Sequence, residues 1–361
     1  MGLTIMLSAG GTGGHLFPAQ ALAEALTRRG HVVDLVTDER VMKYGAAFPA
    51  RKIYEVPAAT PSGGSLFAKA KAGLTLVWGA VKARGVVGSV KPNAIVGFGG
   101  YPTVPPMLAA KGAGVPSILH EQNAVIGRAN KFLSGAVDLI ATGFPTLDGV
   151  TDAIRPKLRH VGNPLRAPVL AAADMPYPDA EQLRVVVTGG SQGARVMSDV
   201  VPAAIALLAP DERARIALTQ QARGEDEARV RSAYAAINFP AEIQPFFTDL
   251  PARMGGAHLV IARSGASTVA ELAAIGRACV LVPFPHALDA DQARNAVELE
   301  TAGAATVIAQ PAFTPERLAQ ELRDALADPD TLKMRGDAAR AVAVLDAAER
   351  LADLVEQVAR K

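Results

Sequence analysis

The chain has 361 residues, which is long enough for two domains with cores of their own. Half of its residues are hydrophobic, and a net charge of +2 is too balanced to indicate a nucleic-acid partner. The single cysteine, Cys279, lies in an apolar run, so a disulfide framework and a cysteine metal site are excluded. An apolar strand begins near residue 4 without a signal peptide, and no run of about 18 apolar residues could span a bilayer. We therefore expect a chain in the cytoplasm or on a surface that faces it.

Apolar runs typical of buried strands alternate with helical patterns along the whole chain. In the first half, we expect strands at residues 4–9, 32–37, 94–97, 117–120, 139–141 and 159–161, and helices near residues 18–29, 66–90, 103–112 and 125–134. After a break at residues 162–178, we expect strands at residues 183–188, 216–219, 243–246, 259–262, 279–282 and 306–308, then one helical pattern from about Thr331 onward. This alternation predicts an α/β fold of two doubly wound parallel sheets, with a cleft between two domains. Ligands are expected beyond the carboxyl ends of the strands.

The first glycine-rich stretch, residues 10–18, reads Gly-Gly-Thr-Gly-Gly-His-Leu-Phe-Pro and joins the first strand to the first helix. Pro18 suits the first turn of that helix. Leu16 stands where a dinucleotide fingerprint needs its third glycine, and His15 stands where a Walker loop needs lysine. The stretch therefore indicates neither a nicotinamide nor an ATP site. Its N–H groups can approach another ligand, or it is only a tight turn.

Two further motifs follow strands of the first half. Residues 97–102 read Gly-Phe-Gly-Gly-Tyr-Pro, and residues 120–123 read His-Glu-Gln-Asn. The second motif resembles a zinc-protease signature only superficially, because Ala124 stands where the second histidine is required. His120 and Glu121 can equally be a hydrogen-bonded pair behind a site.

The second half repeats the strand–loop–helix pattern. Residues 189–195 read Gly-Gly-Ser-Gln-Gly-Ala-Arg, and residues 262–271 read Ala-Arg-Ser-Gly-Ala-Ser-Thr-Val-Ala-Glu. Serine and threonine hydroxyls at a helix start suit an anion, and Glu271 can accept from both ribose hydroxyls or cap the helix. Polar side chains of the kind that sugar hydroxyls require follow the next strand: His286, Asp289, Asp291, Gln292 and Asn295.

These motifs, together with Gly-Asn-Pro-Leu-Arg at residues 162–166, occur in one order over the whole chain. The ordered set resembles the MurG family of peptidoglycan N-acetylglucosaminyltransferases, which are two-domain inverting glycosyltransferases of the GT-B type. The resemblance implies two Rossmann-like domains that face each other across a cleft. Residues 1–162 would bind the acceptor and the membrane, with a helix at about 340–361 packing back on them, and residues 163–339 would bind UDP-N-acetylglucosamine.

The resemblance implies transfer of N-acetylglucosamine from UDP-N-acetylglucosamine to the C4 hydroxyl of the muramyl sugar of undecaprenyl-diphospho-muramoyl-pentapeptide. This step converts lipid I to lipid II and contributes to cell shape and division. The resemblance also implies a peripheral protein on the cytoplasmic face of the inner membrane, with other cell-wall synthesis and division proteins as partners.

Site residues are carried over from the family by position. Those implied for the donor are Thr12, Gly13, Gly14, Asn123, Arg166, Ser191, Phe247, Ala266, Ser267, Thr268, Val269, Ala270, Glu271 and Gln292. Those implied for the acceptor are Gly11, His15, Gly99, Gly100 and Tyr101. The family has Gln-Gln after a shorter Phe-Gln-His stretch, whereas residues 284–292 here read Phe-Pro-His-Ala-Leu-Asp-Ala-Asp-Gln. We align Gln292 with the second glutamine, which leaves the roles of Asp289 and Asp291 open.

The implied mechanism is a direct displacement with inversion at the anomeric carbon. No Asp-x-Asp metal clamp stands directly at the end of a predicted strand, so we expect neither a metal nor a cofactor. Helix N-termini would stabilise the leaving diphosphate. His15 is our first candidate for the base, because imidazole titrates near neutral pH. A hydrogen bond to a phosphate, or support of the loop, is an equal alternative.

Residues 66–84 have the pattern of an amphipathic helix. Helical spacing collects Leu66, Phe67, Leu74, Val77, Trp78 and Val81 on one stripe, flanked by Lys69, Lys71 and Lys82. Most such helices pack on a sheet, but the lone tryptophan and the basic flanks favour an anionic membrane surface.

Two rival functions remain open at this point. A UDP-N-acetylglucosamine 2-epimerase shares the two-domain fold and the nucleotide sugar, but the early glycine stretch argues against it. A non-catalytic protein could keep the fold and only bind a nucleotide sugar, although the presence of Glu271 argues against such a relic.

Overall fold

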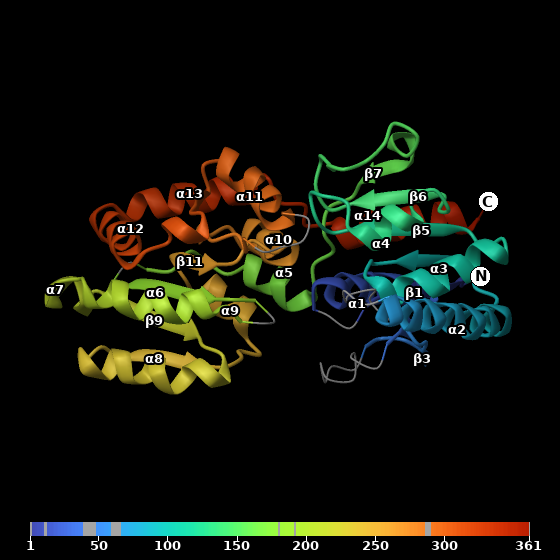
Figure 1. Ribbon diagram of the computed structural model, residues 1–361. Coiled ribbons are helices and arrows are strands. Elements are labelled where there is room, and N and C mark those ends of the chain that lie inside the picture. The colour runs from blue at the N-terminus through green and yellow to red at the C-terminus, as the bar shows by residue number, and fades with distance from the viewer. Residues whose placement is uncertain are drawn as a thin grey trace. The chain divides into compact units, whose positions relative to one another are not determined.

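The computed structural model describes residues 2–10, 13–38, 48–58, 66–179, 181–190, 193–285 and 290–360, and for residues 66–72 and 76 it describes the backbone alone. The chain forms two compact units (Figure 1). Unit 1 comprises Met1–Arg166 and Val344–Lys361, and unit 2 comprises Ala167–Ala343. Each unit contains one sheet in which all described pairs of strands are parallel, which confirms the predicted α/β fold.

The sheet of unit 1 has the strand order β3-β2-β1-β4-β5-β6-β7. Its strands are β1 (Thr4–Ser8), β2 (Val32–Thr37), β3 (Lys52–Glu55), β4 (Ala94–Gly97), β5 (Ser117–Glu121), β6 (Leu139–Thr142) and β7 (Leu158–His160). Its helices are α1 (Gly13–Arg28), α2 (Leu66–Val90), η2 (Tyr101–Thr103), α3 (Val104–Gly112), α4 (Arg128–Leu133), η3 (Arg155–Lys157) and α14 (Ala347–Ala359).

Helices cover both faces of this sheet. Successive residues of a strand point to opposite faces, and the central strands have apolar residues on both of them. Ile5 and Leu7 of β1 pack in a core with α1 and α14. Met6, between them, packs in a second core with α2, α3 and α4. The central strands are therefore buried on both faces, which explains their continuous apolar sequences.

The sheet of unit 2 has the order β10-β9-β8-β11-β12-β13. Its strands are β8 (Leu183–Thr188), β9 (Ile216–Gln221), β10 (Ala241–Gln244), β11 (Leu259–Ala262), β12 (Ala278–Leu281) and β13 (Ala305–Val307). Its helices are α5 (Ala167–Ala173), α6 (Arg195–Ala206), α7 (Pro210–Ala214), α8 (Gly224–Ala236), α9 (Leu250–Gly255), α10 (Ala266–Ile275), α11 (Asp291–Thr301), η4 (Gln310–Ala312), α12 (Pro315–Ala327) and α13 (Pro329–Ala341).

The strand order places the glycine-rich loops at equivalent points of the two sheets. In unit 1 the order reverses between β1 and β4, and in unit 2 between β8 and β11. A crevice beyond the carboxyl ends of the strands forms at such a reversal, and ligands of doubly wound sheets bind there. The loops that follow these four strands contain the glycine-rich and serine-rich motifs of the sequence.

Several predicted boundaries were wrong. Helix α1 begins at Gly13, so Pro18 lies in its interior and not in its first turn. Proline has no N–H, so Pro18 cannot donate a hydrogen bond to the carbonyl of Gly14. Strand β10 ends at Gln244, because Pro245 cannot donate to the ladder. The helical pattern after Thr331 is divided into α13 and α14. Strand β3, at the edge of its sheet, was not predicted.

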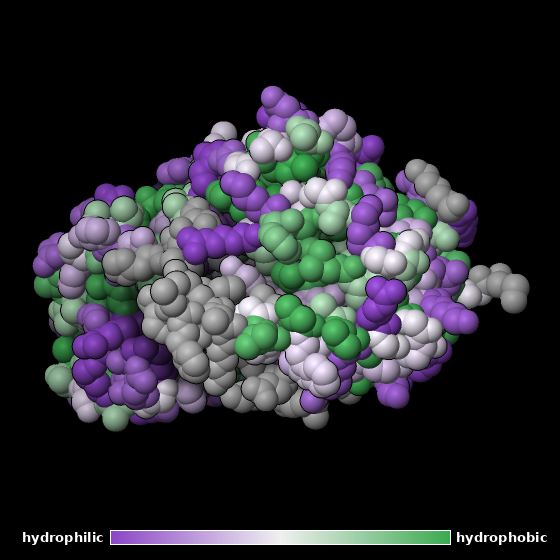
Figure 2. Space-filling view, turned by 45° about the vertical axis from the view of Figure 1, so that its right-hand side comes forward, coloured by the Kyte–Doolittle hydropathy of each residue, from purple (hydrophilic) through white to green (hydrophobic). Residues whose placement is uncertain are grey.

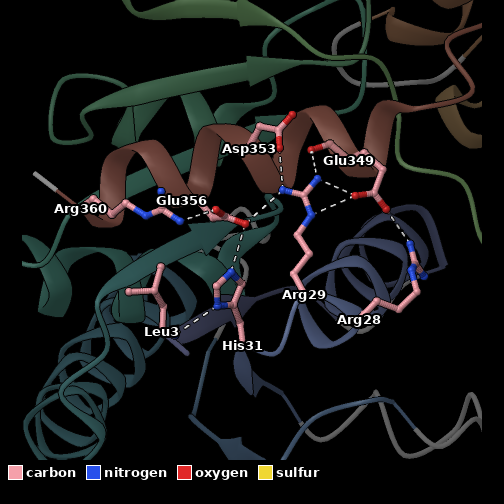
Figure 3. Close-up of polar contacts among 8 residues, drawn as sticks. All are labelled: Leu3, Arg28, Arg29, His31, Glu349, Asp353, Glu356 and Arg360. Carbon is pink, nitrogen blue, oxygen red and sulfur yellow. Dashed lines mark hydrogen bonds and ion pairs between the residues drawn. The ribbon is translucent and has the colours of Figure 1, made fainter. Parts of the chain in front are cut away.

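Helix α14, near the end of the chain, is attached to unit 1 by a cluster of charged side chains (Figure 3). Arg29 donates to Glu349, Asp353 and Glu356, at 2.5, 2.6 and 3.1 Å. His31 accepts from the backbone N–H of Leu3 through Nδ1, so its Nε2 carries the hydrogen that faces Glu356 at 3.1 Å. The cluster fixes α14 against the start of β2 and the end of α1.

Replacing Arg29 with alanine should lower the free energy of unfolding at pH 7 by about 1–2 kcal/mol. Arg29 lowers the pKa of Glu349, and His31 followed by Arg29 lowers that of Glu356, from the ordinary value of 4.5. A carboxylate with a lowered pKa stabilises the fold above its unfolded pKa, and this stabilisation is lost as pH falls through the folded value. When the pH is lowered from 7 to below about 4.5, the free energy of unfolding should therefore fall less in the Arg29→Ala protein than in the wild type.

Urea unfolding between pH 3 and 7 measures this difference. Arg28→Ala is the matched control, because the Arg28 side chain is 63% exposed and, within the described part of the chain, forms an ion pair with Glu349 alone. We expect it to change stability by no more than about 0.5 kcal/mol. Equal losses in the two variants would show that the cluster contributes no more than an ordinary surface pair.

Candidate functional site

His15 lies in the first turn of α1, against the two glycines that follow β4. A β-carbon at Gly99 would lie 3.4 Å from His15 Nε2, and one at Gly100 would lie 3.4 Å from Cε1 of the same ring. Gly99 and Gly100 have φ of 87° and 75°, a region that favours glycine. The imidazole thus packs against backbone at the reversal point of the unit 1 sheet, together with the predicted acceptor residues Gly99 and Gly100.

Glu121, at the end of β5, is a buried hub of hydrogen bonds. Its Oε1 accepts from the backbone N–H and from Nδ2 of Asn123, at 3.0 and 3.2 Å. Its Oε2 accepts from Gly127 N and Asn130 Nδ2, at 2.9 and 2.8 Å. Burial raises the pKa of Glu121, and these bonds oppose the shift. All four groups are N–H donors, so they match an ionised Glu121 carboxylate. Their hydrogen bonds orient Asn123, which is predicted to bind the sugar donor.

His120 is a satisfied core residue. Its Nε2 lies 3.0 Å from the carbonyl of Gly162, and its Nδ1 lies 3.0 Å from Gln122 Nε2. Burial lowers the pKa of His120 to about 4, so the ring is neutral at pH 7. Asn163 Nδ2 donates to the carbonyl of Gln122 at 3.0 Å. The residues after β7 are thereby tied to the residues after β5.

Arg166 is the last residue of the first segment of unit 1, and it lies beside α1. Its guanidinium is 3.7 Å from the centre of the Phe17 ring. A β-carbon at Gly13 would lie 3.1 Å from the edge of that ring. Two predicted donor residues, Gly13 and Arg166, therefore flank one aromatic side chain. Tyr101 begins η2 directly after the glycine pair.

In unit 2, Gln221 at the end of β9 supports the glycine loop that follows β8. Its Oε1 accepts from Thr188 Oγ1 at 2.8 Å and from Gly189 N at 3.1 Å, and its Nε2 donates to the carbonyls of Gly190 and Pro245, both at 3.2 Å. Gln221 is 8% exposed. Sequence reasoning missed this residue, because nothing but its place at the end of a strand marked it.

The start of α10 follows β11 and has buried hydroxyls that face no described partner. Ser264 Oγ and Ser267 Oγ are buried without a hydrogen-bond partner within the described part of the chain. Asn295 Nδ2 donates to the carbonyl of Ser264 at 3.2 Å. α10 begins with the residues predicted to bind the sugar donor, which are Ala266, Ser267, Thr268, Val269, Ala270 and, directly after them, Glu271. Unsatisfied hydroxyls beside helix N–H groups are suited to an anionic ligand.

Arg263 holds the backbone of the residues that follow β12. Its Nη1 donates to the carbonyls of Val282 and Pro283, at 2.9 and 3.1 Å, and its Nη2 donates to Gln310 Oε1 at 2.6 Å. Burial lowers the pKa of this guanidinium. Gln292, a predicted donor residue on α11, accepts from Phe284 N through Oε1 at 3.0 Å. Sequence reasoning missed Arg263 and Gln310 as supports of this segment.

The remaining predicted residues have different outcomes. Phe247 is buried after β10, with the Arg253 guanidinium 4.4 Å from its ring centre. Gly14 is exposed in the first turn of α1. Outside the described residues lie Gly11, Thr12, Ser191, His286 and Asp289, and the same holds for the side chains of Leu66, Phe67, Lys69 and Lys71.

Helix α2 turns one face to unit 1 and leaves an apolar face exposed. A β-carbon at Gly79 would lie 2.2 Å from the carbonyl oxygen of Pro57 and 3.2 Å from a side-chain atom of Pro105, so this side of α2 packs closely. The exposed face carries Leu74, Val77, Trp78 and Val81, with 72, 64, 63 and 60% of each residue exposed. On the face drawn in Figure 2, green hydrophobic residues are likewise exposed among purple hydrophilic ones. The core-packing interpretation of Trp78 was therefore wrong.

The helices α2, α3 and α4 contain no aspartate or glutamate in their sequences. Their charged residues are Lys69, Lys71, Lys82, Arg84, Lys111, Arg128 and Lys131. Phe132 of α4 is 68% exposed. Among the described residues, no helix combines the length and the apolarity needed to cross a bilayer.

The chain is similar to known glycosyltransferases over nearly its full length. Residues 5–142 match the glycosyltransferase family 28 N-terminal domain, and residues 184–356 match the glycosyltransferase family 28 C-terminal domain. A protein of Methylorubrum populi, named UDP-N-acetylglucosamine–N-acetylmuramyl-(pentapeptide) pyrophosphoryl-undecaprenol N-acetylglucosamine transferase, is 55% identical over 98% of this chain and 97% of its own.

A relative with the same name from Rhodopseudomonas palustris is 53% identical over 99% of this chain and 98% of its own. Among solved structures, the crystal structure of Acinetobacter baumannii MurG covers 99% of this chain and 100% of its own, with a TM-score of 0.78 and 28% identity.

Proposed function

The chain belongs to glycosyltransferase family 28, and on that premise we propose that it is an N-acetylglucosaminyltransferase of peptidoglycan synthesis. It transfers N-acetylglucosamine from UDP-N-acetylglucosamine to the muramyl sugar of lipid I and forms lipid II. The observation that carries this proposal is the identity of 55% over 98% of the chain to a transferase of this name.

Unit 2 is proposed to bind the donor. The unpartnered hydroxyls of Ser264 and Ser267 and the N–H groups at the start of α10 suit the diphosphate of UDP. Glu271 on α10 suits the ribose hydroxyls, since a carboxylate only accepts hydrogen bonds. Gln292 is proposed to contact the sugar, with Ser191 and Phe247 as further donor contacts. Preorganised hydrogen-bond donors, such as these hydroxyls and N–H groups, stabilise a leaving diphosphate as charge develops on it.

Unit 1 is proposed to bind the acceptor at the loops around His15, with Gly11, Gly99, Gly100 and Tyr101. His15 is the proposed base: it takes the proton of the C4 hydroxyl while the hydroxyl oxygen bonds to the anomeric carbon and UDP departs with the electron pair of the broken bond. Thr12, Gly13, Gly14, Asn123 and Arg166 are proposed to contact the donor from unit 1.

A polyprenyl acceptor requires access to a bilayer, and we propose that the exposed face of α2 binds an anionic leaflet. The apolar residues Leu74, Val77, Trp78 and Val81 are exposed, and the helices α2, α3 and α4 carry only basic charges. Each lysine or arginine near such a surface contributes about 1 kcal/mol. The proposed location is the cytoplasmic face of the inner membrane, and contacts with cell-division proteins stay a prediction.

The transfer of radiolabelled N-acetylglucosamine from UDP-N-acetylglucosamine to a lipid I analogue tests the proposed reaction. We expect labelled product with and without EDTA, and equal rates would support the prediction that no removable metal takes part. The control reaction omits the acceptor. Epimerised donor sugar without product would favour the 2-epimerase alternative, and bound donor without either product would favour a binding protein.

A further inference from the structure

The side chain of Arg166 lies against the ring of Phe17 on α1, within unit 1. The guanidinium carbon of Arg166 is 3.7 Å from the centre of this ring. At that distance the planar guanidinium can only lie over the face of the ring, because the ring hydrogens block its edge. The face of an aromatic ring carries partial negative charge, so it attracts the cation. Phe17 therefore holds Arg166 by an electrostatic contact as well as by packing.

The backbone before Arg166 is fixed by other contacts. Asn163 Nδ2 donates to the carbonyl of Gln122 at 3.0 Å, and Leu165 is 7% exposed. The long side chain of an arginine has many rotamers, and holding it in one of them costs conformational entropy. A contact that orders such a side chain before a ligand arrives lowers the entropy cost of binding.

The same ring contacts the first residue of α1. A β-carbon at Gly13 would lie 3.1 Å from Phe17 Cε2 and 3.4 Å from Cζ. Gly13 and Phe17 are four positions apart on α1, so they lie on one side of the helix. The N–H groups of a first helical turn have no partner within the helix and favour an anion. One aromatic ring thus contacts both the N-terminal turn of α1 and a guanidinium.

We propose that Phe17 is a positioning residue for Arg166. Its ring holds the guanidinium beside the first turn of α1 before the donor binds, so that two groups that favour an anion are ordered together for the donor diphosphate. The contact uses the face of the guanidinium. Unlike an ion pair with a carboxylate, it occupies none of the in-plane N–H groups and does not cancel the positive charge. The role toward the donor rests on the proposed function, in which Gly13 and Arg166 contact UDP-N-acetylglucosamine.

Fluorinated phenylalanine at position 17 of the full chain tests this role. One, two or three fluorine atoms withdraw electrons from the ring and weaken its attraction for a cation stepwise, while the ring keeps nearly the same shape. The Kd for UDP-N-acetylglucosamine, measured by titration calorimetry, should rise with each fluorine and reach about 5-fold with three, which corresponds to the loss of one cation–π contact. In the Arg166→Met protein the donor should bind more weakly, and the fluorine atoms should have no further effect.

Proton NMR of the chain without donor tests the contact itself. The side-chain signals of Arg166 should be shifted upfield by the ring current of Phe17, and this shift should disappear in Phe17→Leu, which keeps an apolar side chain at the position. The same fluorinated residues at position 313 provide the control, because Phe313 is 3% exposed in the apolar core of unit 2. They should leave the donor affinity unchanged.

An unchanged Kd across the Phe17 series would overturn the proposal, and so would a change that persists in Arg166→Met. Tighter binding with fluorine would also overturn it, because the ring would then hold Arg166 away from the donor. A wild-type chain that shows the ring-current shift but binds no UDP-N-acetylglucosamine would overturn the proposed function and leave Phe17 as the residue that positions Arg166.

Discussion

Replacing Gly189 with alanine should weaken the binding of UDP-N-acetylglucosamine about 100-fold or more. A β-carbon there would lie 2.1 Å from Ala194 N and 2.4 Å from the carbonyl carbon of Gly193, which are backbone atoms at the start of α6. The loop and the first turn of α6 must shift together, and Gly189 N must leave Gln221 Oε1. A displacement of about 1 Å in a binding loop is enough to cost this much affinity. Titration calorimetry with UDP-N-acetylglucosamine measures the loss.

Gly224→Ala is the control for this substitution. Gly224 begins α8 in the same unit, and a β-carbon there would meet no atom within 4 Å. Its donor affinity should remain within about 2-fold of the wild type, and both variants should keep the far-ultraviolet circular dichroism of the wild type. If Gly189→Ala binds the donor as tightly as Gly224→Ala does, the glycine loop after β8 is not the donor site.

The double variant Leu74→Ser, Trp78→Ser should bind vesicles that contain anionic lipid about 100-fold more weakly than the wild type. Full burial of one large apolar side chain contributes about 1.5–3 kcal/mol, and insertion at an interface realises part of this for each residue. Both side chains are more than 60% exposed, so their replacement removes little packing within the protein. Vesicle sedimentation at low and high salt measures the partition coefficient.

Met334→Ser on α13 is the matched control, since Met334 is 63% exposed in unit 2. It should bind vesicles as the wild type does. High salt should weaken vesicle binding by the wild type and by Met334→Ser alike. Salt screens the attraction between the basic residues of α2–α4 and the anionic lipid. Retention of wild-type affinity by the double variant would show that another surface binds the membrane.

Most of the fold could be predicted from the sequence, because the central strands are buried on both faces and read as continuous apolar runs. Strand β3 could not, since Lys52 and Glu55 are exposed at an edge of the sheet. The break between α13 and α14 could not either, because residues 342–346 contain neither glycine nor proline. It has a tertiary cause: Val344 packs against Gly162, where a β-carbon would lie 2.7 Å from it.

The site was predictable where its chemistry depends on local sequence. Glycine and serine loops that follow strands are visible in the chain, and the strand order places them at the two reversal points. The supports of these loops were not predictable, because their partners are distant in sequence. Gln221 holds Gly189 from 32 positions away, and Arg263 reaches Gln310 across 47. A polar residue at the end of a strand does not reveal which loop it will bind.

The attachment of α14 has a consequence for the order in which the chain folds during synthesis. The core of unit 1 includes Leu351, Val355 and Val358, which leave the ribosome only after all of unit 2 has been made. The apolar faces of β1 and α1 therefore stay partly exposed to solvent while residues 167–343 are translated. Domains usually complete their folding from the N-terminal end. Here the unit that begins first should finish last, so a stalled nascent chain that ends before residue 347 would expose the surface that α14 covers.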